Sequence, residues 1–155
     1  MEKGVNIQPS KRNSIIITVP FTDIEEVNLA GSGDVVSKAV IEANNFECAV
    51  AGSGDIILEI DAQDVKAAVA GSGDLTLKGT TQNLKASVAG SGDIHTKGLE
   101  ARKIDASVAG SGDIELNCDS CDLKARVSGS GDIKYLGKTN REDFKVSGSG
   151  SISNW

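Results

Sequence analysis

The sequence predicts an all-β fold, a single-domain parallel β-helix (β-solenoid) with coils of about 20 residues. The tetrapeptide GSGD occurs six times, beginning at residues 31, 52, 71, 90, 110 and 129, and a seventh copy, GSGS, begins at residue 148. Apolar residues alternate with polar or small residues around each copy, which is the pattern of a β-strand. Gly accounts for 18 of the 155 residues and aromatic residues for only 3%. This composition suits a fold with many tight corners around a narrow interior.

The segment 1–28 is expected to form entry strands before the repeats. Ser14–Val19 is rich in β-branched residues and is followed by Pro20, which would end a strand. Gly4–Gln8 is a second candidate strand. The first 20 residues contain neither the apolar segment nor the small-residue cleavage site of a signal peptide.

The segment 29–155 is expected to form seven coils, each with one GSG corner. In every copy an apolar residue stands two positions before the first Gly and another stands four positions after it, such as Val69 and Leu75 around Gly71. The residue four positions before that Gly is usually Ala, and in one coil it is Cys48. Stacking equivalent strands in parallel would bury these columns, and each coil would add about 4.8 Å to the length. Each coil would thus contain a strand of about six residues, the GSG corner, a short second strand and a corner of variable length.

The GSG corners are predicted to be structural turns. Gly adopts positive φ without steric cost and allows one backbone to approach another closely, so two Gly in three residues permit a sharp bend between sheets. The predicted turn residues are Gly31, Gly33, Gly52, Gly54, Gly71, Gly73, Gly90, Gly92, Gly110, Gly112, Gly129, Gly131, Gly148 and Gly150.

The Asp that follows each corner has two interpretations. Its carboxylate can accept hydrogen bonds from nearby backbone N–H groups and stabilise the turn. Alternatively, the stacked carboxylates form a ladder that binds cations weakly, although Ca²⁺ prefers six to eight oxygen ligands and the calcium-binding nonapeptide pattern is not matched. The seventh copy has Ser151 at this position, so the Asp ladder ends one coil before the stack. The ladder residues are Asp34, Asp55, Asp74, Asp93, Asp113 and Asp132.

The remaining candidates for chemistry do not form a catalytic set. Cys118 and Cys121 form a single C-x-x-C in a variable corner, and with only one His in the chain they lack partners for a zinc site. They are expected to be two thiols or a local disulfide, whereas Cys48 belongs to the core. His95 is expected on the outer surface without a partner. No nucleophile, base and orienting group occur together, so we predict no catalytic residues, no cofactor and no enzyme activity.

Composition excludes two classes of partner. A formal net charge of −6 with 3% aromatic residues argues against nucleic-acid binding. No run of 18 or more apolar residues is present, so no transmembrane segment is expected.

A column of small residues precedes the corners and predicts a smooth strip along the rod. The strip has two interpretations: it docks another rod or an extended ligand, or its residues simply fit a tight corner. The column consists of Ala30, Ala51, Ala70, Ala89, Ala109, Ser128 and Ser147.

The repeated VAGSGDI-x-L array, closing on GSGSIS, resembles the "putative auto-transporter adhesin, head GIN domain" family. The segment SIIITVPFTDIEEVNLAGSGD is similar to the strand-Pro-strand entry of that family. The resemblance implies a right-handed parallel β-helix with GSG at the tight turn between sheets. It also implies export and a role in adhesion at the surface of Gram-negative bacteria. The family has no known catalytic residues, so only the GSG turns carry over to this chain.

Taken together, these observations predict a non-catalytic structural or adhesion module of the cell surface or envelope. The first alternative is a carbohydrate-binding or carbohydrate-active parallel β-helix, and the second is a Ca²⁺-responsive solenoid. The expected partners are a glycan or protein of a host or cell surface. Further copies of the chain, as a trimer or an end-to-end stack, are also expected.

Overall fold

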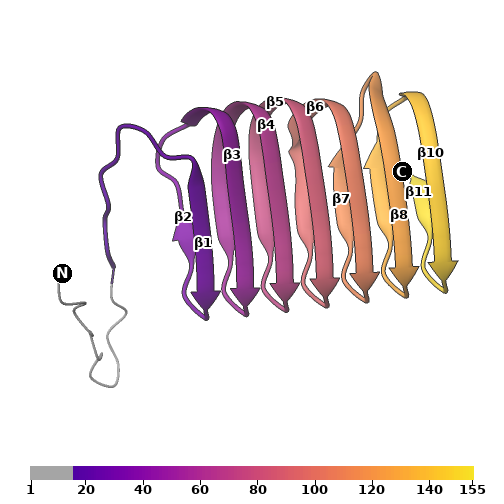
Figure 1. Cartoon of the computed structure of the whole chain (residues 1–155), viewed down its shortest axis with the longest axis horizontal. Helices are drawn as coiled ribbons and strands as arrows, with labels where there is room; N and C mark the ends of the chain where they lie inside the picture. The colour runs from indigo at the N-terminus through magenta and orange to yellow at the C-terminus, as the bar shows by residue number, and fades with distance from the viewer. Residues whose placement is uncertain (1–15) are drawn as a thin grey trace.

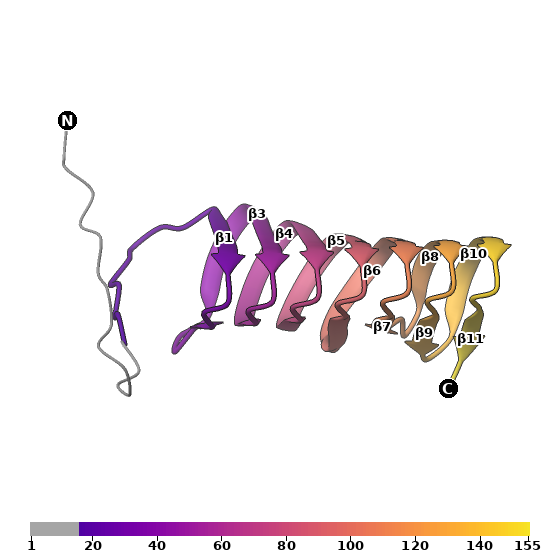
Figure 2. The ribbon, with the colours of Figure 1, turned by 90° about the horizontal axis from the view of Figure 1, so that it is seen from below.

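The protein is a parallel β-solenoid in which successive coils lie side by side along one axis (Figure 1), and Figure 2 shows the same stack from below. The structure is a computed structural model and describes residues 16–155. All strand pairs in this range are parallel, and none of its residues is helical. The prediction of an all-β solenoid with coils of about 20 residues is therefore confirmed. The described residues also contain no helix long and apolar enough to cross a membrane.

Eleven strands form the coils. They are β1 (Glu26–Gly31), β2 (Val35–Val36), β3 (Ile41–Gly52), β4 (Ile56–Gly71), β5 (Leu75–Gly90), β6 (Ile94–Gly110), β7 (Ile114–Asn117), β8 (Cys121–Gly129), β9 (Ile133–Leu136), β10 (Thr139–Gly148) and β11 (Ile152–Asn154).

Equivalent positions of the repeat stack directly on one another. Val69 of β4, for example, pairs with Val50 in β3 and with Val88 in β5. The GSG corners stack in the same register, because Gly71 pairs with Gly52 and with Gly90. A single register through the whole stack means that each sequence column becomes a row of side chains parallel to the solenoid axis.

The variable corner differs from the expectation of a loop between two short strands. In β4, β5 and β6 the strand continues through this corner, so β4 has 16 residues and β6 has 17. Coils of equal length can keep their hydrogen-bond ladder through a bend, and β4 pairs with β5 on both sides of it. The register shifts where the coil lengths differ, as between Thr76 and Lys78 in the pairing of β5 with β6, and it also shifts between Thr139 and Arg141 in the pairing of β10 with β8. Turns without strand structure follow β7 and β9.

The strand expected over Ser14–Val19 is absent from the part of this segment that the structure describes. Residues 16–19 form no strand, and the first strand begins at Glu26. Ile16, Ile17 and Val19 have 85%, 69% and 70% of their surface exposed. Their β-branched side chains favour a strand only when a neighbouring strand supports them, and no described residue does so here. Ser14 and the candidate strand Gly4–Gln8 lie outside the described residues.

The core is one narrow stack of apolar columns. The smallest column, at the centre of the solenoid, contains Cys48 and four Ala residues, all with 0% exposure. Burial, assisted by the nearby charge of Glu47, raises the pKa of the Cys48 thiol to about 12. The thiol is therefore protonated at neutral pH and acts as a small apolar side chain, as the sequence predicted. The column consists of Cys48, Ala67, Ala86, Ala106 and Ala125.

The two Gly residues of a corner are required for different reasons. Gly90 has a φ of +139°, which L side chains rarely adopt, and a Cβ there would lie 2.4 Å from the Gly71 carbonyl oxygen. Gly92 lies outside that region of φ, but a Cβ at this position would lie 2.1 Å from the Gly73 carbonyl oxygen. The second Gly is thus required only because the backbone of the preceding coil is so close.

This contact predicts a large loss of stability for Gly92→Ala. The added methyl group meets main-chain atoms that cannot move without breaking the ladder, so we expect a destabilisation of about 3 kcal/mol or more. Urea unfolding followed by circular dichroism measures the change. Gly98→Ala is the matched control, because its Cβ would meet only the flexible Lys78 side chain, at 3.0 Å. Equal stability of the two variants would contradict the backbone-contact explanation.

Candidate functional site

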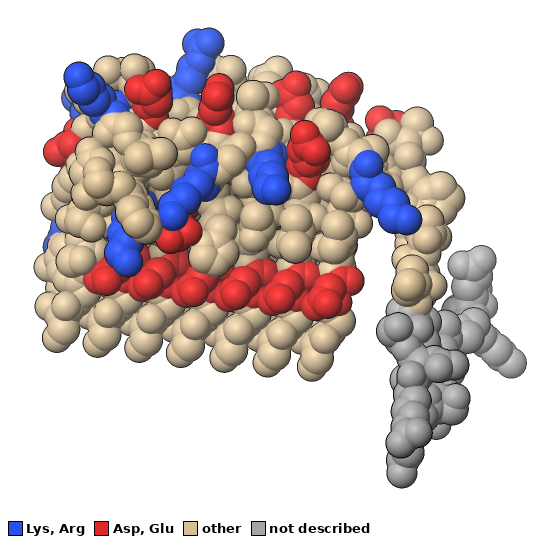
Figure 3. Space-filling model, turned by 180° about the vertical axis from the view of Figure 1, so that it is seen from behind, with Lys and Arg blue, Asp and Glu red and all other residues tan. Residues whose placement is uncertain are grey.

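The Asp residues of the GSGD corners stabilise the neighbouring coil. One carboxylate oxygen of each Asp accepts a hydrogen bond from the backbone N–H of the Asp one coil further on, as from Asp74 N to Asp55 at 3.0 Å and from Asp132 N to Asp113 at 2.7 Å. Asp132 closes the series by accepting hydrogen bonds from Ser151 N at 2.7 Å and Ser151 Oγ at 2.9 Å. The six carboxylates form the continuous acidic row that Figure 3 shows along the solenoid. The hydrogen-bonding role expected for Asp is thus present, but its partner lies in the next coil rather than in the same turn.

No metal centre can be built from the described residues. Within residues 16–155, no three His, Cys, Asp or Glu side chains are grouped so that they would hold a metal ion. The acidic row forms a line of hydrogen bonds between coils.

A long concave surface forms a groove on the flank of the solenoid. It has a volume of about 890 Å³ and crosses β3, β4, β5, β6, β8 and β10, which lie side by side in Figure 1. We call it the flank groove. Its floor follows a column of buried apolar residues that are 2–3% exposed. This column consists of Phe46, Val65, Leu84, Ile104 and Leu123.

Two rows of polar side chains border the floor, one on each side. The row nearer the GSG corners consists of Glu26, Glu47, Lys66, Lys85, Asp105, Lys124 and Asp143. The second row consists of Asn45, Asp64, Asn83, Lys103, Asp122 and Arg141, and Glu25 and Glu142 complete the lining at the two ends.

Several groove residues bind one another across coils. Lys66 forms an ion pair with Glu47 at 2.5 Å, and Lys124 forms one with Asp105 at 3.2 Å. In the second row the Asn83 amide donates a hydrogen bond to Asp64 at 2.7 Å.

Three groove cations have no such partner. Lys85, Lys103 and Arg141 make no ion pair with any described residue. Lys85 lies between Lys66 and Asp105 in its row, in the middle of the groove. The groove therefore has unpaired positive charge at its centre, from Lys85 and Lys103, and mixed charge at its C-terminal end, where Arg141 lies beside Glu142 and Asp143.

The strip of small residues lies on the same outer face, between the flank groove and the GSG corners. All seven of its side chains are exposed. The position is compatible with both interpretations of the strip, since it is accessible and also adjoins the corner.

His95 has a partner, so the expectation of an isolated surface residue was wrong. Its Nδ1 lies 2.8 Å from Oε2 of Glu115, and Lys97 Nζ lies 3.1 Å from the other oxygen of that carboxylate. Lys97 also lies over the ring of Trp155, 3.9 Å from its centre. Burial alone would raise the pKa of the Glu115 carboxyl, but the hydrogen bonds from His95 and Lys97 outweigh burial and lower it. This cluster ties the C-terminal residue to the preceding coils.

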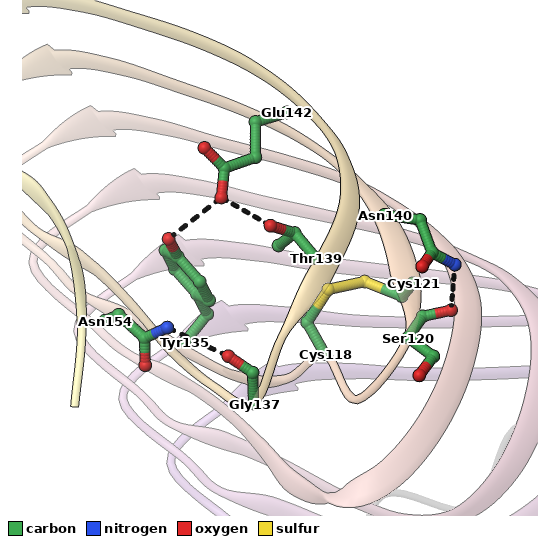
Figure 4. The surroundings of a disulfide bond; sticks show 9 residues. All are labelled: Cys118, Ser120, Cys121, Tyr135, Gly137, Thr139, Asn140, Glu142 and Asn154. Atoms are coloured by element: carbon green, nitrogen blue, oxygen red, sulfur yellow. Dashed lines mark hydrogen bonds between the residues drawn. A yellow bond between two sulfur atoms is a disulfide. The ribbon is translucent and has the colours of Figure 1, made fainter.

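Cys118 and Cys121 form a disulfide between β7 and β8 (Figure 4). Both residues are fully buried, and Ser120 between them has a φ of +62°. Asn140 in β10 donates a hydrogen bond to the Ser120 carbonyl at 2.7 Å, which fixes this turn to the next coil. Of the two alternatives left open by the sequence, the structure contains the disulfide.

The flank groove was not predicted from the sequence. Its polar rows were visible as outward positions in each repeat, but the pattern does not show that two of them border a depression. The variable corner creates this depression, because two successive exposed residues, such as Gln63 and Asp64, interrupt the alternation there.

Comparison with known proteins identifies relatives of the same architecture. The family model described as "Putative auto-transporter adhesin, head GIN domain" matches residues 1–139. A crystal structure of a "putative lipid binding protein" from Parabacteroides distasonis has a TM-score of 0.81 and 35% identity over 86% of this chain. A "putative adhesin" from Bacteroides fragilis has a TM-score of 0.78 and 28% identity over 85% of it. The chain spans 54% and 61% of the lengths of these two proteins. No curated protein matches it.

The Glu115 cluster predicts a specific dependence of stability on pH. Because folding lowers the pKa of Glu115 from its ordinary value of 4.5, its contribution is present above that value. It is lost as the pH falls through the lowered pKa. We expect Glu115→Gln to cost about 1 kcal/mol at pH 7, and to cost progressively less below about pH 4.5.

Melting temperatures of both proteins between pH 3 and pH 7 measure this dependence. Glu100→Gln is the control, because Glu100 is exposed and has no ion-pair partner among the described residues. A Glu115→Gln deficit that does not change with pH would contradict the assignment.

Proposed function

We propose, because the chain belongs to the family described as "Putative auto-transporter adhesin, head GIN domain", that it is a non-catalytic adhesion module of the bacterial surface or envelope. The relatives are described as an adhesin and as a lipid-binding protein, and neither description is that of an enzyme. The contact surface that we assign to this function is the flank groove.

The disulfide supports an exported location. Disulfides persist in oxidising compartments such as the periplasm and the cell surface, and they are rare in the cytosol. Cys118 and Cys121 are paired and buried, so the bond is part of the folded coil rather than an exposed redox pair.

The geometry of the flank groove carries the proposal. A groove that crosses successive coils in one register offers the same two rows of side chains about every 4.8 Å. Its rows lie on hydrogen-bonded strands, which hold functional groups more rigidly than loops do. A linear ligand lying along the axis would therefore meet a preformed series of evenly spaced side chains whose charge changes from coil to coil.

The charge distribution favours an extended, hydroxyl-rich polymer that carries anionic groups, namely an acidic polysaccharide. Asn45, Asn83 and the paired acids offer hydrogen bonds to hydroxyl groups, while Lys85 and Lys103 are free to bind carboxylate or sulfate. The groove floor has no exposed aromatic ring on which a sugar would stack, since Phe46 is 2% exposed. Affinity would then depend on charge and on many weak contacts along the groove.

Binding to acidic polysaccharides tests this function. We expect the wild-type protein to bind them on a glycan array and in titration calorimetry, with an affinity that falls as salt is added. The variant Lys85→Glu/Lys103→Glu should bind at least about 10-fold more weakly.

Lys38→Glu/Lys78→Glu is the matched control, because it makes the same change in charge outside the groove and should retain binding. Equal binding by both double variants would exclude the flank groove. Depolymerisation of any polysaccharide would instead establish the carbohydrate-active alternative, and preferred binding to anionic lipid vesicles would indicate a lipid ligand.

The Ca²⁺-responsive alternative is tested by removing metal. If the acidic row is stabilised by hydrogen bonds between coils, excess EDTA should change the melting temperature by less than about 1 °C, because no bound ion is lost. Differential scanning calorimetry with EDTA and with added CaCl₂ measures the effect. A fall of many degrees with EDTA that Ca²⁺ restores would establish a metal-dependent solenoid.

A further inference from the structure

Gly33 is a glycine that the described part of the chain does not require. At the second Gly of the six later corners, a Cβ would lie 1.9–2.1 Å from a carbonyl oxygen of the preceding coil. At Gly33 it would meet no described atom within 4 Å, and its φ lies outside the region that favours glycine. The described residues therefore leave space on the N-terminal side of the first corner, where the GSG backbone of one further coil would fit.

The backbone groups at this edge are also those that a preceding coil would bind. At an inner corner, the Gly110 carbonyl accepts hydrogen bonds from Ser130 N at 2.8 Å and Gly131 N at 3.1 Å. The equivalent N–H groups of Ser32, Gly33 and Asp34 have no acceptor among the described residues. The N-terminal edge thus presents a row of three donors.

The C-terminal coil presents the matching acceptors. No described coil follows β10 and β11, so the Gly148 carbonyl, which is the equivalent of the Gly110 carbonyl, accepts none of these bonds. Ser151 stands in the place of the ladder Asp, and its hydroxyl oxygen has lone pairs available for a further donor. Because all strands are parallel, the two ends of the stack are complementary to each other and not to themselves.

The side chains at the two ends match in the same register. Val27, Leu29 and Val35 are half-buried at the N-terminal end. In the C-terminal coil, Phe144 and Val146 are 37% and 45% exposed, and Ile152 is half-buried. Stacked in register, the three pairs would be Val27 on Phe144, Leu29 on Val146 and Val35 on Ile152, which continues the apolar columns of the core.

Charge at this junction is partly compensated. In the same register Glu25 would lie on Glu142 and Glu26 beside Asp143, which are two like-charge contacts. Arg141 and Lys145 stand two residues to either side of Asp143 on the same outer face, so they would lie diagonal to Glu26. The two cations offset part of the repulsion among the four carboxylates.

We propose that the N-terminal edge formed by β1, β2 and the Gly31–Asp34 corner binds the C-terminal coil of a second copy of this chain. The association is head-to-tail, so it continues the parallel sheet from one molecule to the next and builds an open, linear assembly. Within that assembly Gly33 has the role that Gly54 has inside one chain.

Sedimentation velocity of the full chain over a concentration series tests the proposal. Wild type should form oligomers that grow with concentration, and electron microscopy should show rods with the width of one solenoid. Gly33→Ala should remain monomeric throughout, with an unchanged melting temperature, because its methyl group has space in the single molecule. Ser32→Ala, in the same corner, is the control and should still assemble.

A mixing experiment distinguishes the two ends. Val146→Lys places a charge in the C-terminal face and should also block assembly by itself. An equimolar mixture of Gly33→Ala and Val146→Lys retains one functional face of each kind and should form a dimer that does not grow further. If Val146→Lys unfolds, the Phe144→Lys variant takes its place.

Three results would overturn the proposal. The first is a wild-type protein that stays monomeric at all concentrations. The second is a Gly33→Ala variant that assembles like wild type. The third is a Gly33→Ala melting temperature lowered as much as that of Gly92→Ala, which would show that residues of the same molecule already cover this edge.

Discussion

The close contact of one GSG backbone with the next is the constraint on which the structure depends. At these corners a single Cβ would come within about 2 Å of a carbonyl oxygen, as at Gly92, so the corner tolerates only Gly at its two key positions. This contact holds the coils in one register. Because the coils share this register, equivalent residues of successive coils lie in a row along the axis. The apolar core, the acidic row and both borders of the flank groove consist of such rows. A solenoid of this kind has few aromatic residues because its interior is narrow, and Cys48 with the Ala column forms a fully buried row of small side chains.

The same regularity explains how the fold accommodates charge. Carboxylates stacked at the corner repel one another by about 1 kcal/mol per neighbouring pair in a water-like dielectric. Each one also accepts a backbone hydrogen bond from the next coil, such as Asp113 from Asp132 N at 2.7 Å, and a charged acceptor makes this bond stronger than a neutral one. On the flank, the Lys66–Glu47 and Lys124–Asp105 ion pairs compensate part of the charge within one row. Charge is thus distributed by row, with one row bound to the backbone and two rows exposed along the flank groove.

The proposed binding function depends on side chains repeated along successive coils rather than on a few residues that converge on one site. The chain presents a long, rigid surface with equivalent side chains at regular intervals, which suits a linear partner. Its two ends are the only places where the parallel ladder of the described residues stops. The flank groove and the two ends share Glu26, Arg141 and Asp143, so contact between copies would continue the groove from one molecule into the next.

Local alternation and the chemistry of Gly are enough to predict the coil length, the inward columns, the all-β class and the position of every GSG corner. The sequence also places Cys48 in the core, since its column is small and apolar in the neighbouring repeats. Contacts across coils depend instead on the folded structure, which brings together His95 with Glu115, Cys118 with Cys121, and each ladder Asp with the backbone of the next coil. The folded structure also decided that Ile16 and Ile17 form no strand despite their propensity, because a strand needs a neighbour at its edge. The flank groove could not be predicted for the same reason. A depression is created by the direction in which the chain bends between sheets, and a pattern of period two shows which side chains point outward but not how the bend arranges them.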